Sequence, residues 1–165
     1  ALDPVYTIGD QIVEIIRIHE KISKKEAYET AVILLKQAKI PPPEVRIQHY
    51  LHELSGGMQH SVMIAIALAC NPKVLIADEP TTALDVTIQA QILSLLKELR
   101  DQLGIAVILI THIMGVVAAV CDRMLVMYGG AVVEEGKCTE LFENPCHPYT
   151  RGLLAAIPCI KEREE

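Results

Sequence analysis

The stretch KVLIADEPTTALD, Lys73–Asp85, changes character twice within a few residues, and it decides the fold. It opens with a short, continuous apolar run, which is typical of a β-strand covered on both faces. The run ends in two adjacent acids, Asp78 and Glu79. Asp85 then stands at the N-cap position of an amphipathic helix that reaches Gly104. The sequence therefore predicts a buried strand, a loop and a helix, the repeating unit of an α/β fold.

The residues after Gly104 continue this alternation. A second apolar run, Ile105–Ile110, predicts another buried strand, and Gly115–Cys121 are expected to form a short helix. A third strand is predicted at Arg123–Tyr128, where Gly129-Gly130 provide a tight turn into the segment AVVEEG. Because strands alternate with helices, we expect a mostly parallel sheet.

The residues before the first strand are predicted to be helical. Thr7–Glu20 carry isoleucines at helical spacing, and Ser23 with Glu26 matches the capping box of a second helix. Ser55 is expected to cap a third, very apolar helix. The composition changes near Leu54, which separates a helical N-terminal third from an α/β remainder.

Composition and charge narrow the classes of function. The chain has 165 residues, of which 51% are hydrophobic but only 4% aromatic, so we expect a core of aliphatic side chains. The net charge is −6 and there is no basic run, which disfavours nucleic acid as a partner. The longest apolar stretches are too short to span a bilayer, and no signal peptide is indicated. The five cysteines show no CxxC spacing, which predicts reduced thiols.

Two of the predicted strands end in polar residues, Asp78-Glu79 and Thr111-His112. In open α/β sheets, ligands bind beyond the carboxyl ends of the strands, so Asp78, Glu79 and His112 are expected to converge. Adjacent acids suit a division of labour, in which one carboxylate holds Mg²⁺ and the other orients or deprotonates a water. The alternative is that these acids only solvate a loop and cap the next helix.

The triplet Ser55-Gly56-Gly57 opens the most hydrophobic helix, where glycine is costly. Helix N-termini leave about four backbone N–H groups unpaired and carry a partial positive charge, so they bind phosphate well. Two residues without side chains would let a phosphate approach these amides. The alternative is ordinary N-capping combined with tight packing.

These signals occur together and in order. LSGGM (Leu54–Met58), VLIADEP (Val74–Pro80), TTALD (Thr81–Asp85) and THIMGVV (Thr111–Val117) resemble the signature motif, Walker B motif, D-loop and switch-histidine loop of ABC transporter ATPases. DPVYTIGDQI near the start and HPYTRGLLAAIP near the end resemble the ATPases of oligopeptide, dipeptide or nickel importers. The resemblance implies an α/β fold: an incomplete P-loop NTPase core with a mostly parallel sheet, plus an N-terminal helical subdomain. It implies a helical subdomain at 1–53, the signature helix and C-terminal half of the ATPase core at 54–141, and an importer-type extension at 142–165.

The resemblance also implies roles for the predicted site residues. Asp78 would hold Mg²⁺ through water, Glu79 would act as the general base on the attacking water, and His112 would contact the γ-phosphate of ATP. The function implied is ATP binding and hydrolysis that energises an importer of dipeptides or oligopeptides.

The remaining implied roles concern a dimer. Ser55, Gly56 and Gly57 would touch the γ-phosphate of an ATP held mainly by a second ATPase subunit, identical or different, and Asp85 would communicate across the interface. The implied partners are that subunit and membrane permease subunits, with no nucleic acid. The implied location is peripheral, on the cytoplasmic face of the cell membrane.

Several features depart from the family pattern. The sequence has no GxxxxGK[ST] phosphate loop (Walker A), so we expect a portion of a longer protein that is inactive and binds ATP poorly by itself. The strand that feeds that loop would lie between Ile105–Ile110 and Arg123–Tyr128. Ile105–Ile110 should therefore either have an unpaired edge, which promotes association, or find a substitute pairing. The family pattern after the signature is replaced by Gln59, His60 and Ser61, and Ile113 follows the switch histidine. These changes keep open a non-catalytic regulatory or interaction module. A non-transport ABC ATPase is the other alternative, and the acidic charge balance and HPYTRGLLAAIP argue against it.

Overall fold

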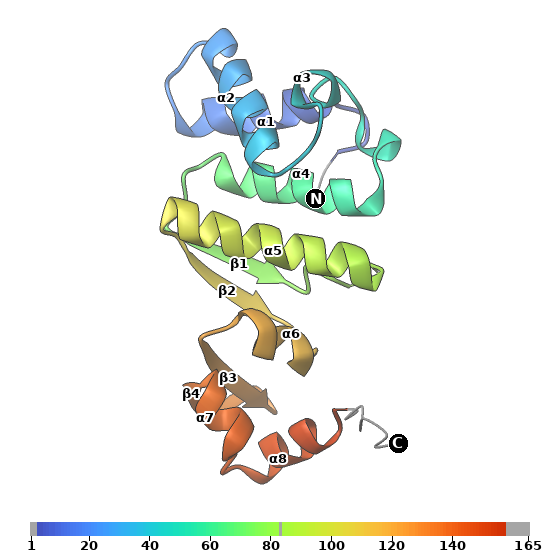
Figure 1. The fold of residues 1–165 in the computed structure, drawn as a ribbon. Helices are drawn as coiled ribbons and strands as arrows, with labels where there is room; N and C mark the ends of the chain where they lie inside the picture. Colours follow the sequence, from blue (N-terminus) through green and yellow to red (C-terminus); the bar gives the residue numbers. More distant parts are fainter. Residues whose placement is uncertain (1–2, 83, 158–165) are drawn as a thin grey trace. The chain divides into compact units, whose positions relative to one another are not determined.

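The computed structural model describes residues 3–82 and 84–157 of the chain (Figure 1). The chain divides into two compact units, Ala1–Ile108 and Leu109–Glu165. This division reflects which residues contact one another. It does not test the domain boundaries expected from the family, after residue 53 and after residue 141, which stay predictions. The end of the expected extension, residues 158–165 with Cys159, lies outside the described residues.

The first unit begins with helices, as the sequence predicts. They are α1 (Ile8–His19), α2 (Lys24–Gln37), α3 (Pro43–Arg46), the 3-10 turn η1 (Leu51–Glu53) and α4 (Gly56–Leu68). The predicted capping box of α2 is confirmed: the Ser23 amide donates to Glu26 Oε2 at 2.9 Å, and the Glu26 amide donates to Ser23 Oγ at 3.2 Å.

The predicted strand–helix–strand unit follows α4 and is confirmed. It consists of β1 (Val74–Asp78), α5 (Val86–Leu103) and β2 (Ala106–Ile110), and the two strands pair side by side in the same direction (Figure 1). Gly104 ends α5 with a φ of 65°, the left-handed conformation that glycine adopts without steric cost.

A single aliphatic core joins the helical part of the first unit to this α/β part. Ile12, Ile16, Leu35, Val62 and Leu99 are all buried in it. Because residues of α1, α2, α4 and α5 share this core, the helical part and α5 pack as one body.

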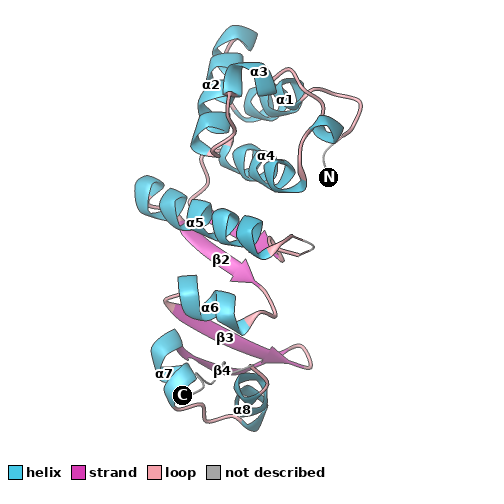
Figure 2. Cartoon of the chain, turned by 45° about the vertical axis from the view of Figure 1, so that its right-hand side comes forward, coloured by secondary structure: helices cyan, strands magenta, loops and turns pink. Residues whose placement is uncertain are grey.

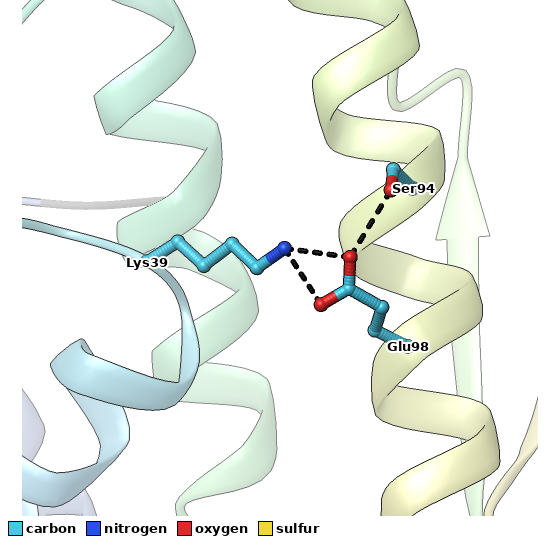
Figure 3. Close-up of polar contacts among 3 residues, drawn as sticks. All are labelled: Lys39, Ser94 and Glu98. Atoms are coloured by element: carbon cyan, nitrogen blue, oxygen red, sulfur yellow. Dashed lines mark hydrogen bonds and ion pairs between the residues drawn. The ribbon is translucent and has the colours of Figure 1, made fainter.

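An exposed ion pair adds to this packing (Figure 3). Lys39, just beyond α2, reaches Glu98 on α5 with an Nζ–Oε2 distance of 2.6 Å. The Ser94 hydroxyl donates to the same carboxylate at 3.1 Å. The contact thus ties the end of α2 to the middle of α5.

The strands β1 and β2 are covered on one face only. Leu75 is buried, and Val107 packs partly buried against the core on the side of α5. Val74, Ile76 and Ile108 on the opposite side are 49%, 63% and 50% exposed. The prediction that these strands are buried on both faces is therefore wrong for the described residues, because α5 covers one face and no described element of the first unit covers the other.

The second unit is a small α/β body around an antiparallel hairpin (Figure 2). It contains α6 (Met114–Val120), β3 (Arg123–Tyr128), β4 (Ala131–Lys137), α7 (Cys138–Glu143) and α8 (Pro148–Ala155). The predicted turn is confirmed, since Gly129 and Gly130 have φ values of 58° and 81°. Val117, Met124 and Leu141 are among the buried residues of a separate small core.

Within the described residues, the strands form two separate two-stranded sheets, β1–β2 and β3–β4. One edge of β2 therefore carries no described strand, which is the unpaired edge expected at Ile105–Ile110. No helix in the described part of the chain has the length and apolar character needed to cross a membrane.

Candidate active site

The N-terminus of α4 is built by Ser55, the N-cap residue. Its Oγ accepts a hydrogen bond from the Met58 amide at 3.4 Å, and Ser55 and Gly56 are both exposed. The first amides of a helix have no partner within the helix, and here two of them belong to Gly56 and Gly57, which have no side chains. This end of α4 can therefore receive an anion.

The two glycines of this turn differ in their surroundings. A Cβ at Gly57 would lie 2.6 Å from Ile88 Cγ2 on α5, whereas a Cβ at Gly56 would lie 3.7 Å from Leu84 Cδ2. The second distance is an ordinary van der Waals contact, and the first is a clash with a stiff, β-branched side chain. Close packing of α4 against α5 thus explains why residue 57 is a glycine, in agreement with the alternative of N-capping and tight packing. It does not explain why residue 56 is a glycine.

The carboxyl end of β1 carries the two adjacent acids. Asp78 is exposed, and Glu79 is half-buried with a φ of 47°, in the left-handed region that non-glycine residues rarely adopt. The Thr82 hydroxyl donates to Glu79 Oε2 at 2.9 Å, and the Thr82 amide donates to the Glu79 carbonyl at 3.1 Å. A tight turn and a side-chain hydrogen bond therefore hold a strained residue, which is characteristic of functional sites.

Asp85 is the N-cap of α5, as the sequence predicts. Its Oδ1 accepts the Ile88 amide at 2.9 Å, and the residue is exposed. The cap fixes the first turn of α5, which is the turn that packs on Gly57.

Three structural ends lie together in the first unit: the N-terminus of α4, the N-terminus of α5 and the carboxyl end of β1 (Figure 1). Leu84 lies beside the position that a Cβ of Gly56 would take, and Ile88 beside that of Gly57, so the two helix ends are close neighbours. The structure therefore brings unpaired helix amides and the loop that carries the acids to the same end of one compact unit.

His112 belongs to the second unit, just after β2, and it is exposed. The Ile113 amide beside it donates to Thr111 Oγ1 at 3.1 Å, and this hydrogen bond bends the backbone around His112. The convergence of His112 with Asp78 and Glu79 stays a prediction.

The donor set suits a magnesium ion that arrives with its substrate. Among the described residues, no group of three or more His, Cys, Asp or Glu side chains could enclose a metal ion. Mg²⁺ is commonly held by one or two carboxylates together with waters and substrate phosphates rather than by an all-protein cage. Asp78, exposed at the end of β1, fits that role.

Sequence reasoning missed three polar residues that shape this site. Thr82 donates to Glu79, while Gln59 and Gln89 hold the loops before α4 and α5. Gln59 stands out only as a departure from the family pattern, and the structure shows that its side chain makes hydrogen bonds with the backbone.

Two family models match parts of the chain. The family model described as "ABC transporter" matches residues 1–82, and the model described as "Oligopeptide/dipeptide transporter, C-terminal region" matches residues 133–165.

Curated relatives match almost the whole chain. It is 54% identical over 158 residues to the "Probable peptide ABC transporter ATP-binding protein y4tR" of Sinorhizobium fredii, covering 96% of this chain and 47% of the relative. It is 56% identical to the "Glutathione import ATP-binding protein GsiA" of Escherichia coli strain K12, covering 96% of this chain and 25% of that protein. The chain thus spans at most about half the length of these relatives.

Solved structures show the same architecture. The ATP-binding cassette MJ0796, in a dimeric post-hydrolysis state bound to ADP and Pi, matches with a TM-score of 0.71 and 33% identity, over 83% of this chain and 59% of that one. The cbiO1 component of the cbiONQ transporter complex of Clostridium perfringens matches with a TM-score of 0.72 and 34% identity, over 84% and 53%.

Proposed function

Because this chain belongs to the family of ABC transporter ATPases, we propose that it forms part of the ATP-binding and ATP-hydrolysing subunit of an importer for dipeptides or oligopeptides. The observation that carries the proposal is that the N-termini of α4 and α5 and the carboxyl end of β1 lie together in the first unit. The exposed residues Ser55 and Gly56 at the start of α4 and the acid-bearing turn at Asp78-Glu79 lie at the same end of one packed body.

The proposed chemistry is hydrolysis of the terminal phosphate of ATP. Glu79 accepts a proton from a water, the water oxygen attacks the γ-phosphorus, and ADP leaves with the bridging oxygen. The hydrogen bond from Thr82 orients the Glu79 carboxylate for this step. His112 contacts the γ-phosphate and stabilises its developing charge.

The proposed metal is Mg²⁺, which would neutralise phosphate charge when bound with ATP. Asp78 would hold it through water. A carboxylate at the carboxyl end of β1 is placed as ligand sites in α/β sheets usually are.

The proposed site is completed by a second ATPase subunit. The amides of Ser55, Gly56 and Gly57 would face the γ-phosphate of an ATP held mainly by that partner, because the first amides of a helix bind phosphate well. Asp85 would contact the partner across the interface. The dimeric state named for the MJ0796 cassette supports this arrangement.

We further propose that permease subunits hold this subunit at the cytoplasmic face of the membrane. The names of the two curated relatives, a peptide transporter component and a glutathione import component, support a peptide-like substrate. The match at residues 133–165 supports the oligopeptide/dipeptide group over nickel.

ATP hydrolysis by the complete gene product tests this proposal. Glu79→Gln keeps the size of the side chain but removes the proton acceptor, so turnover should fall by about 10²-fold or more while ATP binding is kept. The matched control is Glu29→Gln, an exposed glutamate on α2. Hydrolysis at the parental rate by Glu79→Gln, or no hydrolysis by the parent, would count against the proposed function.

A further inference from the structure

The side chain of Gln89, in the first turns of α5, holds the loop that follows the two acids. Its Nε2 donates to the Thr81 carbonyl at 3.1 Å and to the Leu84 carbonyl at 3.3 Å. A side-chain amide nitrogen has two hydrogens, so these two hydrogen bonds use both of them.

The side chain of Gln59 does the same on α4. Its Nε2 donates to the carbonyls of Leu51 and Leu54, each at 3.1 Å. The same arrangement occurs at both helices. Each glutamine lies four positions after the N-cap residue of its helix, and the two carbonyl acceptors lie four positions and one position before that N-cap residue. The caps are Ser55 on α4 and Asp85 on α5.

Each of these loops carries part of the proposed site. The loop held by Gln89 contains Thr82, whose hydroxyl donates to Glu79. The side chain of Thr81, next to it, is only 1% exposed, so this loop is packed inward as well as bonded. The loop held by Gln59 leads directly into the exposed residues Ser55 and Gly56 at the start of α4.

We infer that Gln59 and Gln89 are a matched pair of positioning residues, one for each loop of the proposed ATPase site. The inference rests on the proposed function and adds to it the residues that fix the two loops. Gln89 acts through Thr82 on the general base Glu79. Gln59 acts through Ser55 on the amides that meet the partner's ATP.

The clean test exchanges the amide for a carboxylate of the same shape. Gln89→Glu places a group with no donor against two carbonyl oxygens, so both hydrogen bonds are lost. A negative charge near a helix N-terminus is itself favourable, so α5 should stay folded. Gln91→Glu, two residues along the same helix at an exposed position, is the matched control for charge.

Kinetics on the complete gene product give the first readout. Gln89→Glu should lower kcat for ATP by about tenfold with KM unchanged, because a misplaced base slows the chemical step. Gln59→Glu should instead raise the ATP concentration needed for activity. If both variants behave like Gln91→Glu, the inference is wrong.

Hydrogen exchange without nucleotide gives the second readout, which does not depend on hydrolysis. Gln89→Glu should speed exchange in peptides that cover 80–85 and leave those that cover 51–55 unchanged, and Gln59→Glu should do the reverse. Faster local exchange without the kinetic changes would show that the glutamines only stabilise the loops, which overturns their positioning role. If the parent protein hydrolyses no ATP, the proposed function is wrong. If hydrogen exchange is unchanged in both variants, the inference about the two glutamines is wrong.

Discussion

Three residues of the first unit, Gly56, Gly57 and Glu79, show how a residue required by packing differs from one that packing does not require. Gly56 and Gly57 look equivalent in the sequence, but only Gly57 lies within 2.6 Å of Ile88 when a Cβ is added. Glu79 adopts a left-handed φ of 47°, which costs free energy that an ordinary loop acid would avoid. Of these three residues, packing therefore explains Gly57 but neither Gly56 nor Glu79.

Alanine substitutions at the two glycines should separate these roles. Gly57→Ala should lower the free energy of unfolding by about 1–3 kcal/mol, because α4 and α5 must move apart. Gly56→Ala should keep stability or raise it slightly, since alanine favours a helix by about 0.5–1 kcal/mol, yet it should weaken ATP-dependent activity. Chemical denaturation of both variants measures the first effect, and ATPase assays measure the second. Equal stability of the two variants would contradict the packing argument.

The N-cap residues and the adjacent acids could be predicted from the sequence, whereas the loop-holding side chains of Gln59 and Gln89 could not. Ser23, Ser55 and Asp85 are polar residues at the starts of periodic segments, and that pattern marks an N-cap. The hydrogen bonds of Gln59 and Gln89 run from side chain to backbone over a loop, which leaves no periodic trace in the sequence. A glutamine four residues after a predicted cap is the signal that could have found them.

Among the elements, α5 organises the first unit. Its first turn packs on Gly57, its Gln89 holds the acid-bearing loop, and its Glu98 binds Lys39 beyond α2. The hydrogen bond from Lys39, followed by that from Ser94, lowers the pKa of the Glu98 carboxyl below its ordinary value of 4.5. A carboxyl whose pKa is lower when folded stabilises the folded state above its ordinary pKa, and this contribution is lost as the pH falls through the folded pKa.

Glu98→Gln should therefore reduce thermal stability at pH 7 by a small amount, because the pair is solvent-exposed. The difference from the parent should shrink as the pH drops below 4.5, where the parental carboxyl becomes protonated. It should also shrink in 1 M salt, which screens exposed charges. Thermal unfolding monitored by circular dichroism measures these differences, with Glu29→Gln as the control. A difference that persisted at low pH would show that the ion pair is not its cause.

At the scale of the whole molecule, the strands were predicted correctly but their surroundings were not. Continuous apolar runs predicted strands covered on both faces, and β1 and β2 do form as a parallel pair. The periodicity of a strand says which faces are apolar, but it does not say which residues cover them. Val74, Ile76 and Ile108 remain about half exposed or more, and surfaces of this kind favour association.

The purified 165-residue chain should therefore self-associate with rising concentration. Ile108→Lys should reduce association, because it places a charge on the uncovered face of β2 next to its open edge. Ile33→Lys, at an exposed position on α2, is the matched control. Sedimentation velocity over a concentration series measures the effect. A monodisperse monomer, or equal effects of the two variants, would contradict this account.

The most direct test of the central claim, a nucleotide site completed by two subunits, is the assembly state of the complete Glu79→Gln gene product with ATP. Because that variant should bind ATP without hydrolysing it, light scattering should show an ATP-dependent dimer that does not form with ADP. Adding Gly56→Asp should abolish the dimer, since its carboxylate would repel the partner's triphosphate at the amides of α4. A dimer that formed equally with ATP, with ADP and in the double variant would contradict the account.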